Sequence, residues 1–250
     1  MLKLENINIT FNKNTANERK ALQHIDLDVA DGDFVTVIGS NGAGKSTLMN
    51  VISGSYEADT GKIFLDGKNI THLKEHQRAR TIGRLFQDPL RGTAPNMTIE
   101  ENLGLAYSRG KRRSLTIGIR KKDVSVFRER LKELDLGLED RMKMPVGLLS
   151  GGQRQLLSIA RGLLRNTKIF LLDEITSNIN GLTERNIVQT VFRLSQNHTV
   201  IMTTHRSTTI MQIPRIIVIC DGKNVAEGTH EKLLNECMTY KELFEKIDSN

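Results

Sequence analysis

The segment from Gly39 to Thr47 constrains the fold of this chain more than any other. It reads Gly39-Ser40-Asn41-Gly42-Ala43-Gly44-Lys45-Ser46-Thr47 and matches the phosphate-loop pattern. The apolar run Phe34–Ile38 before it predicts a buried strand, and Lys45–Ser53 predicts a helix. At such a helix N-terminus backbone N–H groups bind the β-phosphate, Lys45 neutralises the β and γ oxygens, and the Ser46 hydroxyl can ligate Mg²⁺. The segment therefore predicts a strand–loop–helix unit that binds a nucleoside triphosphate.

Two acidic residues follow a second predicted strand. The apolar run Ile169–Leu172 predicts a strand buried on both faces, as in a parallel sheet covered by helices. Asp173 and Glu174 come directly after it, so both carboxylates would lie at the sheet edge where the phosphate loop also opens. There Asp173 would hold Mg²⁺ through water, and Glu174 would act as general base on the attacking water. The alternative is a solvated acidic strand end, which the phosphate loop upstream disfavours.

Two further polar residues extend this candidate site. His205 follows the next predicted buried strand, Thr199–Met202, and its place in the series favours a contact with the γ-phosphate. A structural histidine at a strand end is the alternative. Gln87 lies where the predicted helical part begins, and it would complete the surroundings of Mg²⁺ and the attacking water. The predicted catalytic residues are Glu174, His205 and Gln87, and the predicted metal residues are Ser46, Gln87 and Asp173.

The pentapeptide Leu149-Ser150-Gly151-Gly152-Gln153 is a second glycine-rich segment. It puts two glycines and a hydroxyl just before a predicted amphipathic helix, and a helix N-terminus of this kind binds anions. One chain thus carries two phosphate-binding ends. If they lie too far apart to share a nucleotide, two copies about a two-fold axis would complete each other's sites. A capped glycine turn without a ligand is the alternative.

The chain as a whole predicts an α/β fold with a mixed, mainly parallel sheet. Residues 1–250 are expected to form one domain. Turns at Asp66-Gly67 and Asp221-Gly222 predict antiparallel β structure at the periphery, and Asp31-Gly32 predicts a turn between two strands. Residues 87–154 predict a helical insertion, with an amphipathic helix from Asp123 to Leu136, between two parts of the catalytic core, 1–86 and 155–250.

Composition limits the classes of partner. The 250 residues carry a formal charge of +7, and part of the excess lies between Arg109 and Lys122. We interpret that segment as a solvated loop, with contact to lipid headgroups or an acidic partner as the alternative. No nucleic acid is expected, because no aromatic residues alternate with these charges.

No apolar run reaches the roughly 18 residues of a membrane span, so any membrane role would be peripheral. The two cysteines, Cys220 and Cys237, form no metal-binding pattern and suit a reducing compartment.

The ordered motifs closely resemble the ATP-binding subunit of ATP-binding cassette (ABC) transporters over nearly the whole chain. The residues that carry the resemblance are Phe11, Gly39 to Thr47, Gln87, Leu149 to Gln155, Leu171 to Glu174 and His205. It implies ATP and Mg²⁺ as ligands, and a head-to-tail homodimer that closes on two ATP molecules and drives paired membrane subunits. These subunits would dock near Gln87 to Thr98, and the protein would lie in the cytoplasm on the inner face of the cell membrane. By position Phe11 resembles the aromatic residue that stacks on adenine, with core packing as the alternative.

Three departures from the family pattern affect this interpretation. Asn180 stands where the family usually has an aspartate, in a loop that normally communicates across the dimer, so tight coupling is in question while hydrolysis should survive. Ile175 stands where a smaller residue is common and requires local repacking. Up to about Arg165 the chain resembles a stand-alone importer-type subunit, and afterwards, as in Gly228 to Leu234, it resembles the end of an exporter's fused domain. Natural drift and an engineered recombination both explain this mosaic.

The sequence therefore predicts a Mg²⁺-dependent ATPase subunit that powers transport through separate membrane subunits. One alternative is a soluble ABC-type protein acting on ribosomes or nucleic acid, which the basic charge suggests; such proteins carry two cassettes or long coiled-coil insertions, and this chain shows neither. Another is a chimera that binds ATP without a transport partner. In this family the membrane and receptor components choose the substrate, although the importer-like first part favours uptake of a small solute.

Overall fold

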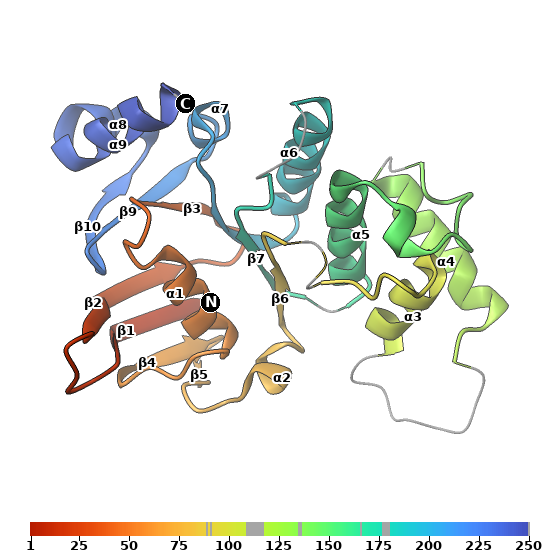
Figure 1. Ribbon diagram of the computed structural model, residues 1–250, viewed down its shortest axis with the longest axis horizontal. Helices are drawn as coiled ribbons and strands as arrows, with labels where there is room; N and C mark the ends of the chain where they lie inside the picture. Colours follow the sequence, from red (N-terminus) through yellow and green to blue (C-terminus); the bar gives the residue numbers. More distant parts are fainter. Residues whose placement is uncertain are drawn as a thin grey trace.

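The computed structural model describes residues 1–88, 90, 92–108, 118–134, 137–165, 167–176 and 181–249. In this part of the chain the strands form two sheets, one with four strands and one with six (Figure 1). The smaller sheet is antiparallel and has the order β2-β1-β4-β5. Its strands are β1 (Leu2–Phe11), β2 (Arg19–Val29), β4 (Thr60–Leu65) and β5 (Lys68–Asn69). Buried and exposed residues alternate along the end of β2, so one face of this sheet packs on the core.

The larger sheet has the order β10-β9-β3-β8-β7-β6. Its strands are β3 (Phe34–Ile38), β6 (Ile82–Leu85), β7 (Ile169–Asp173), β8 (Thr199–Thr203), β9 (Arg215–Cys220) and β10 (Lys223–Gly228). Neighbouring strands are parallel except for β9 and β10. Strands β3, β7 and β8 are buried along their whole length, as expected for strands covered on both faces. The predicted α/β class with a mixed, mainly parallel sheet is confirmed.

The three predicted turns each lie between two strands, as expected, but one of the strands lies further inside the fold than expected. The Asp221-Gly222 turn joins β9 and β10, but β9 is an inner strand of the larger sheet, parallel to β3, rather than part of a peripheral layer. The Asp31-Gly32 turn lies between β2 and β3, which belong to different sheets. The turn at Asp66-Gly67 does join paired strands of the smaller sheet. Local sequence thus located the turns, whereas long-range pairing decided which strands share a sheet.

Helix α1 (Lys45–Ser53), which follows the phosphate loop, packs between the two sheets. Its residues Leu48, Met49 and Ile52 share one buried cluster with apolar side chains of both. Strand β7 divides its side chains between the faces of the larger sheet: Ile169 and Leu171 belong to that cluster, and Phe170 and Leu172 to a second one on the other face. The second cluster contains residues of α5 (Gly151–Leu163) and α6 (Gly181–Ser195), which cover that face.

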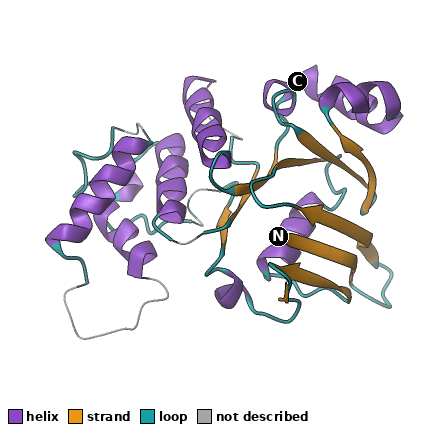
Figure 2. Ribbon diagram, turned by 180° about the vertical axis from the view of Figure 1, so that it is seen from behind, coloured by secondary structure: helices purple, strands orange, loops and turns teal. Residues whose placement is uncertain are grey.

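Three helices form a lobe at one end of the molecule (Figures 1 and 2). They are α3 (Ile99–Ser108), α4 (Lys121–Glu133) and α5, with a 3₁₀ turn at Val146–Leu148 before α5. Helix α4 confirms the predicted amphipathic helix with Phe127 and Leu131 fully buried, but it begins two residues earlier. Residues 135–136 at the predicted end lie outside the described residues, as do residues 109–117, most of the basic segment.

The remaining helices are α2 (Glu75–Arg78), α7 (Ser207–Ile210), α8 (His230–Glu236) and α9 (Met238–Asp248). A third buried cluster joins α8 and α9 to the larger sheet through Tyr240, Leu233, Ile216 and Val218. Of the helices that the structure describes, none is both long enough and apolar enough to span a bilayer.

Candidate active site

Lys45 opens helix α1 at the end of the phosphate loop and is 5% exposed. Its Nζ donates hydrogen bonds to the carbonyl oxygens of Gly39 (2.8 Å) and Ser40 (3.1 Å). Burial lowers the pKa of Lys45, while the charges of Glu174 and Asp173 act in the opposite direction. The ammonium group is therefore held inside the loop, close to where phosphate oxygens can replace the two carbonyl contacts.

Two glycines of the loop are needed because the loop lies against neighbouring strands. A Cβ on Gly39 would lie 2.2 Å from the carbonyl oxygen of Ile219 in β9. Gly44 has a φ of +113°, and a Cβ there would lie 2.6 Å from the carbonyl oxygen of Ala21 in β2. No other residue type fits either position without moving backbone. The packing of β9 and β2 thus fixes the shape of the loop.

The Asp173 carboxylate, at the end of β7, faces the start of α1. Thr203 Oγ1 donates to Asp173 Oδ1 at 3.0 Å, and Ser46 Oγ lies 3.4 Å from the same oxygen. Arg84 Nη2, from β6, lies 3.4 Å from Oδ2. The register of three neighbouring parallel strands, β6, β7 and β8, brings these side chains to one edge of the sheet.

Glu174 has a strained backbone and a fixed side chain. Its φ is +46°, in the left-handed region, and its N–H donates to Thr203 Oγ1 at 3.0 Å. Its carboxylate oxygen Oε1 lies 2.8 Å from Nε2 of His205, which follows β8. This hydrogen bond lowers the pKa of Glu174 more than partial burial raises it. The carboxylate is therefore ionised near neutral pH and directed by His205, as a general base requires.

The donors around Asp173 suit a magnesium ion shared with phosphate. Ser46 and Asp173 offer only oxygen atoms, which Mg²⁺ prefers, and one or two protein ligands plus substrate phosphates are its usual surroundings. Within the described ranges no group of three or more His, Cys, Asp or Glu side chains could hold a metal alone. The residues present thus fit an ion that depends on bound nucleotide for the rest of its ligands.

The pentapeptide at the start of α5 forms a capped helix N-terminus. Ser150 Oγ accepts a hydrogen bond from the N–H of Gln153 at 3.3 Å, and the Gln153 side chain accepts one from the N–H of Ser150 at 3.1 Å. This is the arrangement expected if the pentapeptide is a capped glycine turn, the alternative to an anion-binding site. Helices α1 and α5 pack on opposite faces of the larger sheet (Figures 1 and 2).

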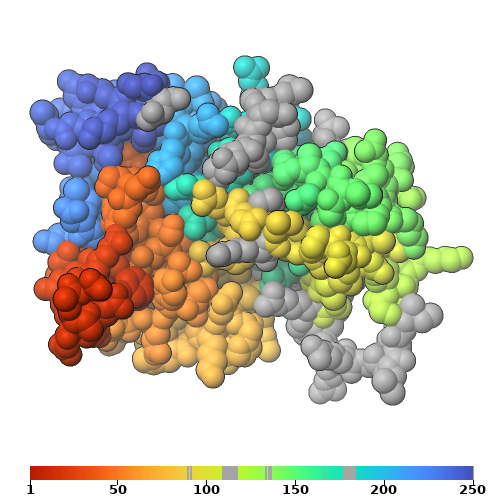
Figure 3. All heavy atoms as spheres, viewed as in Figure 1, coloured from red at the N-terminus to blue at the C-terminus, as the bar shows by residue number. Residues whose placement is uncertain are grey.

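Gln87 lies just after β6 and is exposed. The backbone beside it is fixed by Gln155 of α5, which is 1% exposed and whose Nε2 donates to the carbonyl oxygens of Phe86 (2.9 Å) and Gln87 (3.2 Å). In the space-filling view the surface that follows β6 lies between the core and the helical lobe (Figure 3). A movement of α5 would therefore be passed to Gln87 through these bonds.

Phe11 is partly buried at the end of β1, and its ring contacts that of Tyr56 edge-on, with centroids 5.4 Å apart. It pairs across the sheet with Arg19, whose guanidinium donates to the carbonyl oxygen of Gly42 in the phosphate loop. Phe11 is thus both a packed residue and a neighbour of the loop, which is compatible with either of its predicted roles.

Three residues of the site were missed in the sequence: Arg84, Thr203 and Arg19. Thr203 directly follows the predicted strand Thr199–Met202, so the signal for it was its position at a strand terminus. Arg84 lies in β6, a strand that the sequence analysis did not predict. Arg19 gave no signal, because its contact with Gly42 depends on how the smaller sheet packs on the loop. Asn180 lies outside the described residues.

The fold and the site define a P-loop nucleoside triphosphatase of the α/β class. The family model that matches, over residues 22–177, is that of the ABC transporter. The chain belongs to the ABC transporter family, as an ATP-binding and ATP-hydrolysing domain that powers transport through membrane partners.

Relatives of two kinds match the chain. The tyrosine transport ATP-binding protein of Clostridioides difficile (strain R20291) is 35% identical over 251 residues, which cover 99% of this chain and 99% of the relative. The ATP-dependent lipid A-core flippase of Vibrio vulnificus (strain CMCP6) is 34% identical over 90% of this chain and 38% of its own length. The multidrug resistance-like ATP-binding protein MdlB of Buchnera aphidicola subsp. Acyrthosiphon pisum (strain APS) is 33% identical over 95% of this chain and 40% of its own length. The chain thus spans nearly all of the first relative and about two fifths of the other two.

Solved structures show the same fold. An ATP-binding cassette in a dimeric post-hydrolysis state bound to ADP and Pi has a TM-score of 0.77 and 30% identity, covering 92% of this chain and 98% of the other. The ADP conformation of an ATP-binding cassette of an ABC transporter has a TM-score of 0.81 and 28% identity, covering 98% of each chain.

Proposed function

We propose that Asp173, Glu174 and His205 form the hydrolytic centre of a subunit that powers solute transport through separate membrane subunits. The observation that carries the proposal is the 2.8 Å contact between His205 and Glu174, next to Asp173. Glu174 accepts a proton from the attacking water, and its lowered pKa keeps it ready to do so near neutral pH. His205 directs the Glu174 carboxylate and contacts the γ-phosphate. Gln87 orients the attacking water from the other side.

The phosphate loop binds the phosphates of ATP. Its backbone N–H groups surround the β-phosphate, and Lys45 leaves its two carbonyl contacts for the β and γ oxygens. The residues of this part are Gly39, Ser40, Asn41, Gly42, Ala43, Gly44, Lys45, Ser46 and Thr47, with Phe11 against the adenine. Ser46, Asp173 and Gln87 would hold Mg²⁺, which neutralises charge on the phosphate oxygens when it is bound.

We further propose that the working unit is a head-to-tail homodimer that forms with ATP. The placement of α1 and α5 on opposite faces of the larger sheet supports this, and in such a dimer Ser150, Gly151, Gly152 and Gln153 would meet the phosphate loop of the second chain. The structural relative bound to ADP and Pi is a dimer. Residues 1–250 would act as one domain, in which a helical part, 87–154, moves against a core made of 1–86 and 155–250.

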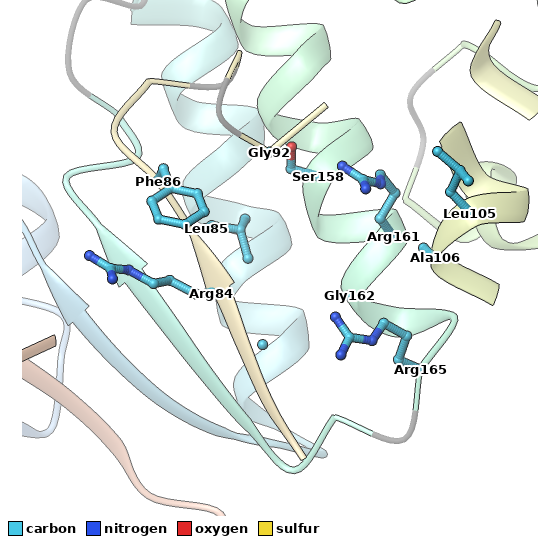
Figure 4. Close-up of a pocket in the computed structure, with 11 residues that line it drawn as sticks. Arg84, Leu85, Phe86, Gly92, Leu105, Ala106, Ser158, Arg161, Gly162 and Arg165 are labelled. Carbon is cyan, nitrogen blue, oxygen red and sulfur yellow. The ribbon is translucent and has the colours of Figure 1, made fainter. Parts of the chain in front are cut away.

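The membrane subunits would dock near Gln87 to Thr98, and the protein would lie in the cytoplasm on the inner face of the cell membrane. A cavity of about 300 Å³ lies beside this segment, between β6 and α5, and includes Phe86, Gly92, Arg161 and Arg165 in its lining (Figure 4). Because this region lies between the core and the helical lobe, a docked subunit could sense their relative position.

The substrate class proposed is a small solute taken up by the cell. It is supported by the importer-like motifs of the first part and by the tyrosine transport relative, which matches the chain over its full length. The flippase and multidrug relatives match as parts of longer chains, and the exporter-like motifs near the end of this chain resemble that branch. Membrane subunits of importer type should therefore stimulate the ATPase more than those of exporter type, whether drift or recombination produced the mosaic.

The test of the hydrolytic centre is Glu174→Gln in the purified chain. We expect ATP binding to be kept and steady-state hydrolysis to fall by about 10²–10⁴-fold, the contribution of a positioned general base. Glu57→Gln is the matched control, because Glu57 is 72% exposed and pairs only with the surface residue His72 in the described structure. Equal hydrolysis by Glu174→Gln and the unchanged protein would exclude the proposed role. Salt-sensitive binding of RNA or DNA would instead favour the nucleic-acid alternative.

A further inference from the structure

Arg84 places a fixed positive charge beside the Asp173 carboxylate. Its side chain is 11% exposed, and Nη2 lies 3.4 Å from Asp173 Oδ2. Nη1 donates to Asn50 Oδ1 at 2.6 Å and to Ser53 Oγ at 3.2 Å, both at the end of α1. The guanidinium carbon lies 4.8 Å from the centre of the Phe86 ring. These contacts anchor the cation from α1 and from its own strand.

The contact with Asp173 is long for a hydrogen bond between charged groups. Its 3.4 Å separation exceeds the roughly 2.7–2.9 Å of a strong charge-assisted hydrogen bond. Arg84 Nε is buried and forms no hydrogen bond with the residues that the structure describes. The other carboxylate oxygen, Oδ1, is held separately by Thr203 at 3.0 Å. The orientation of Asp173 therefore does not depend on Arg84, which acts on it mainly through charge.

We propose that Arg84 acts through its charge on Asp173 to oppose the binding of a divalent metal ion there, and so promotes release of the metal with the product. This inference rests on the proposed metal-binding role of Asp173. A fixed positive charge close to a bound metal ion raises the energy of that ion. The repulsion is large where few water molecules screen the two charges from each other. When no metal is bound, the positive charge of Arg84 compensates the negative charge of Asp173, so the buried carboxylate is not left unpaired.

The experiment measures Mn²⁺ binding in the presence of ADP, from the electron paramagnetic resonance signal of free Mn²⁺. Arg84→Gln should bind Mn²⁺ at least about threefold more tightly than the unchanged protein, because a nearby repulsive charge has been removed. Arg80→Gln is the control: Arg80 is exposed and the substitution changes the net charge equally, so its Mn²⁺ affinity should not change. ADP affinity without metal reports whether the nucleotide site itself is intact.

Two more variants keep the test decisive. Arg84→Lys preserves the charge and spares the fold, but a single ammonium group cannot reach both Asn50 and Asp173. This variant should therefore bind Mn²⁺ more tightly than the unchanged protein and less tightly than Arg84→Gln. Asp173→Asn should lose Mn²⁺ binding. If it does and both Arg84 variants bind Mn²⁺ no more tightly than the unchanged protein, the inference alone is wrong. If Asp173→Asn binds Mn²⁺ as the unchanged protein does, the metal-binding role of Asp173 fails and the inference fails with it.

Discussion

His205 Nε2 and Glu174 Oε1 lie 2.8 Å apart, although the two residues follow different strands of the larger sheet. The parallel pairing of β7 with β8 places Asp173 opposite Thr203, so the residues that follow each strand meet at one edge. Thr203 contributes twice, with Oγ1 donating to Asp173 and accepting from the N–H of Glu174. The strained φ of +46° at Glu174 is the backbone conformation that turns its carboxylate toward His205.

Replacing His205 should change the pH dependence of hydrolysis. The hydrogen bond from His205 is the largest cause of the lowered Glu174 pKa. In His205→Ala that pKa rises, so the acidic limb of the rate profile should move to higher pH, in addition to a lower maximal rate. Rates of ATP hydrolysis measured across the acidic range check this. His76→Ala, at an exposed position, is the control and should leave the acidic limb in place. An unmoved acidic limb in His205→Ala would contradict the proposed pairing of His205 with Glu174.

Glu174 should also make stability depend on pH. Its pKa in the folded protein lies below the ordinary value of 4.5, so its stabilising contribution is fully present above that value and is lost as the pH falls through the folded pKa. Glu174→Gln should therefore lose less free energy of unfolding between pH 7 and pH 4 than the unchanged protein does. Urea unfolding at both pH values measures the difference. Glu242→Gln, at an exposed position, should lose as much free energy of unfolding between pH 7 and pH 4 as the unchanged protein.

Gly44→Ala should destabilise the fold as well as the phosphate site. The new Cβ would lie 2.6 Å from the carbonyl oxygen of Ala21 at a φ of +113°, so either β2 or the loop must move. We expect a cost of about 1–3 kcal/mol in the free energy of unfolding and weaker ATP binding. Gly118→Ala is the control, since a Cβ there meets nothing within 4 Å and φ is not positive. Equal melting temperatures for the two variants would contradict the expected clash between a Cβ at position 44 and the backbone of β2.

Ser150→Ala separates helix capping from a role in the dimer. Ser150 and Thr229 each cap a helix by accepting from the backbone N–H three residues on, at 3.3 Å in both cases. Each alanine variant should lose about 1 kcal/mol of stability. Only Ser150→Ala should also reduce ATP-dependent dimerisation, measured by size-exclusion chromatography, and hydrolysis. If both variants hydrolyse ATP equally well, the capped turn is the whole role of Ser150.

The sequence was most informative where a local pattern has one structural outcome. The phosphate-loop pattern, the buried apolar runs and the turn at Asp66-Gly67 each predicted the element that the structure contains, because the signal for each lies in residues adjacent in the chain. Strand β9 shows the limit: the turn that follows it was predicted, but its inner place beside β3 depends on pairing with residues far away in the chain. Helix α4 was predicted from its periodicity, but it begins at Lys121 and ends at Glu133 rather than spanning Asp123 to Leu136, because helix ends depend on capping as well as on burial.

By itself, the sequence determined the α/β class and the family, and it predicted which groups would handle phosphate and water, since these depend on residue types in a fixed order. The tertiary structure decided how those groups are held. It set the register that brings Thr203 and Arg84 to Asp173, the approach of Ala21 to Gly44, and the separation of α1 and α5 on two faces of one sheet. Each of these contacts joins segments distant in the chain, and only the packing of sheets and helices fixes the distances between them.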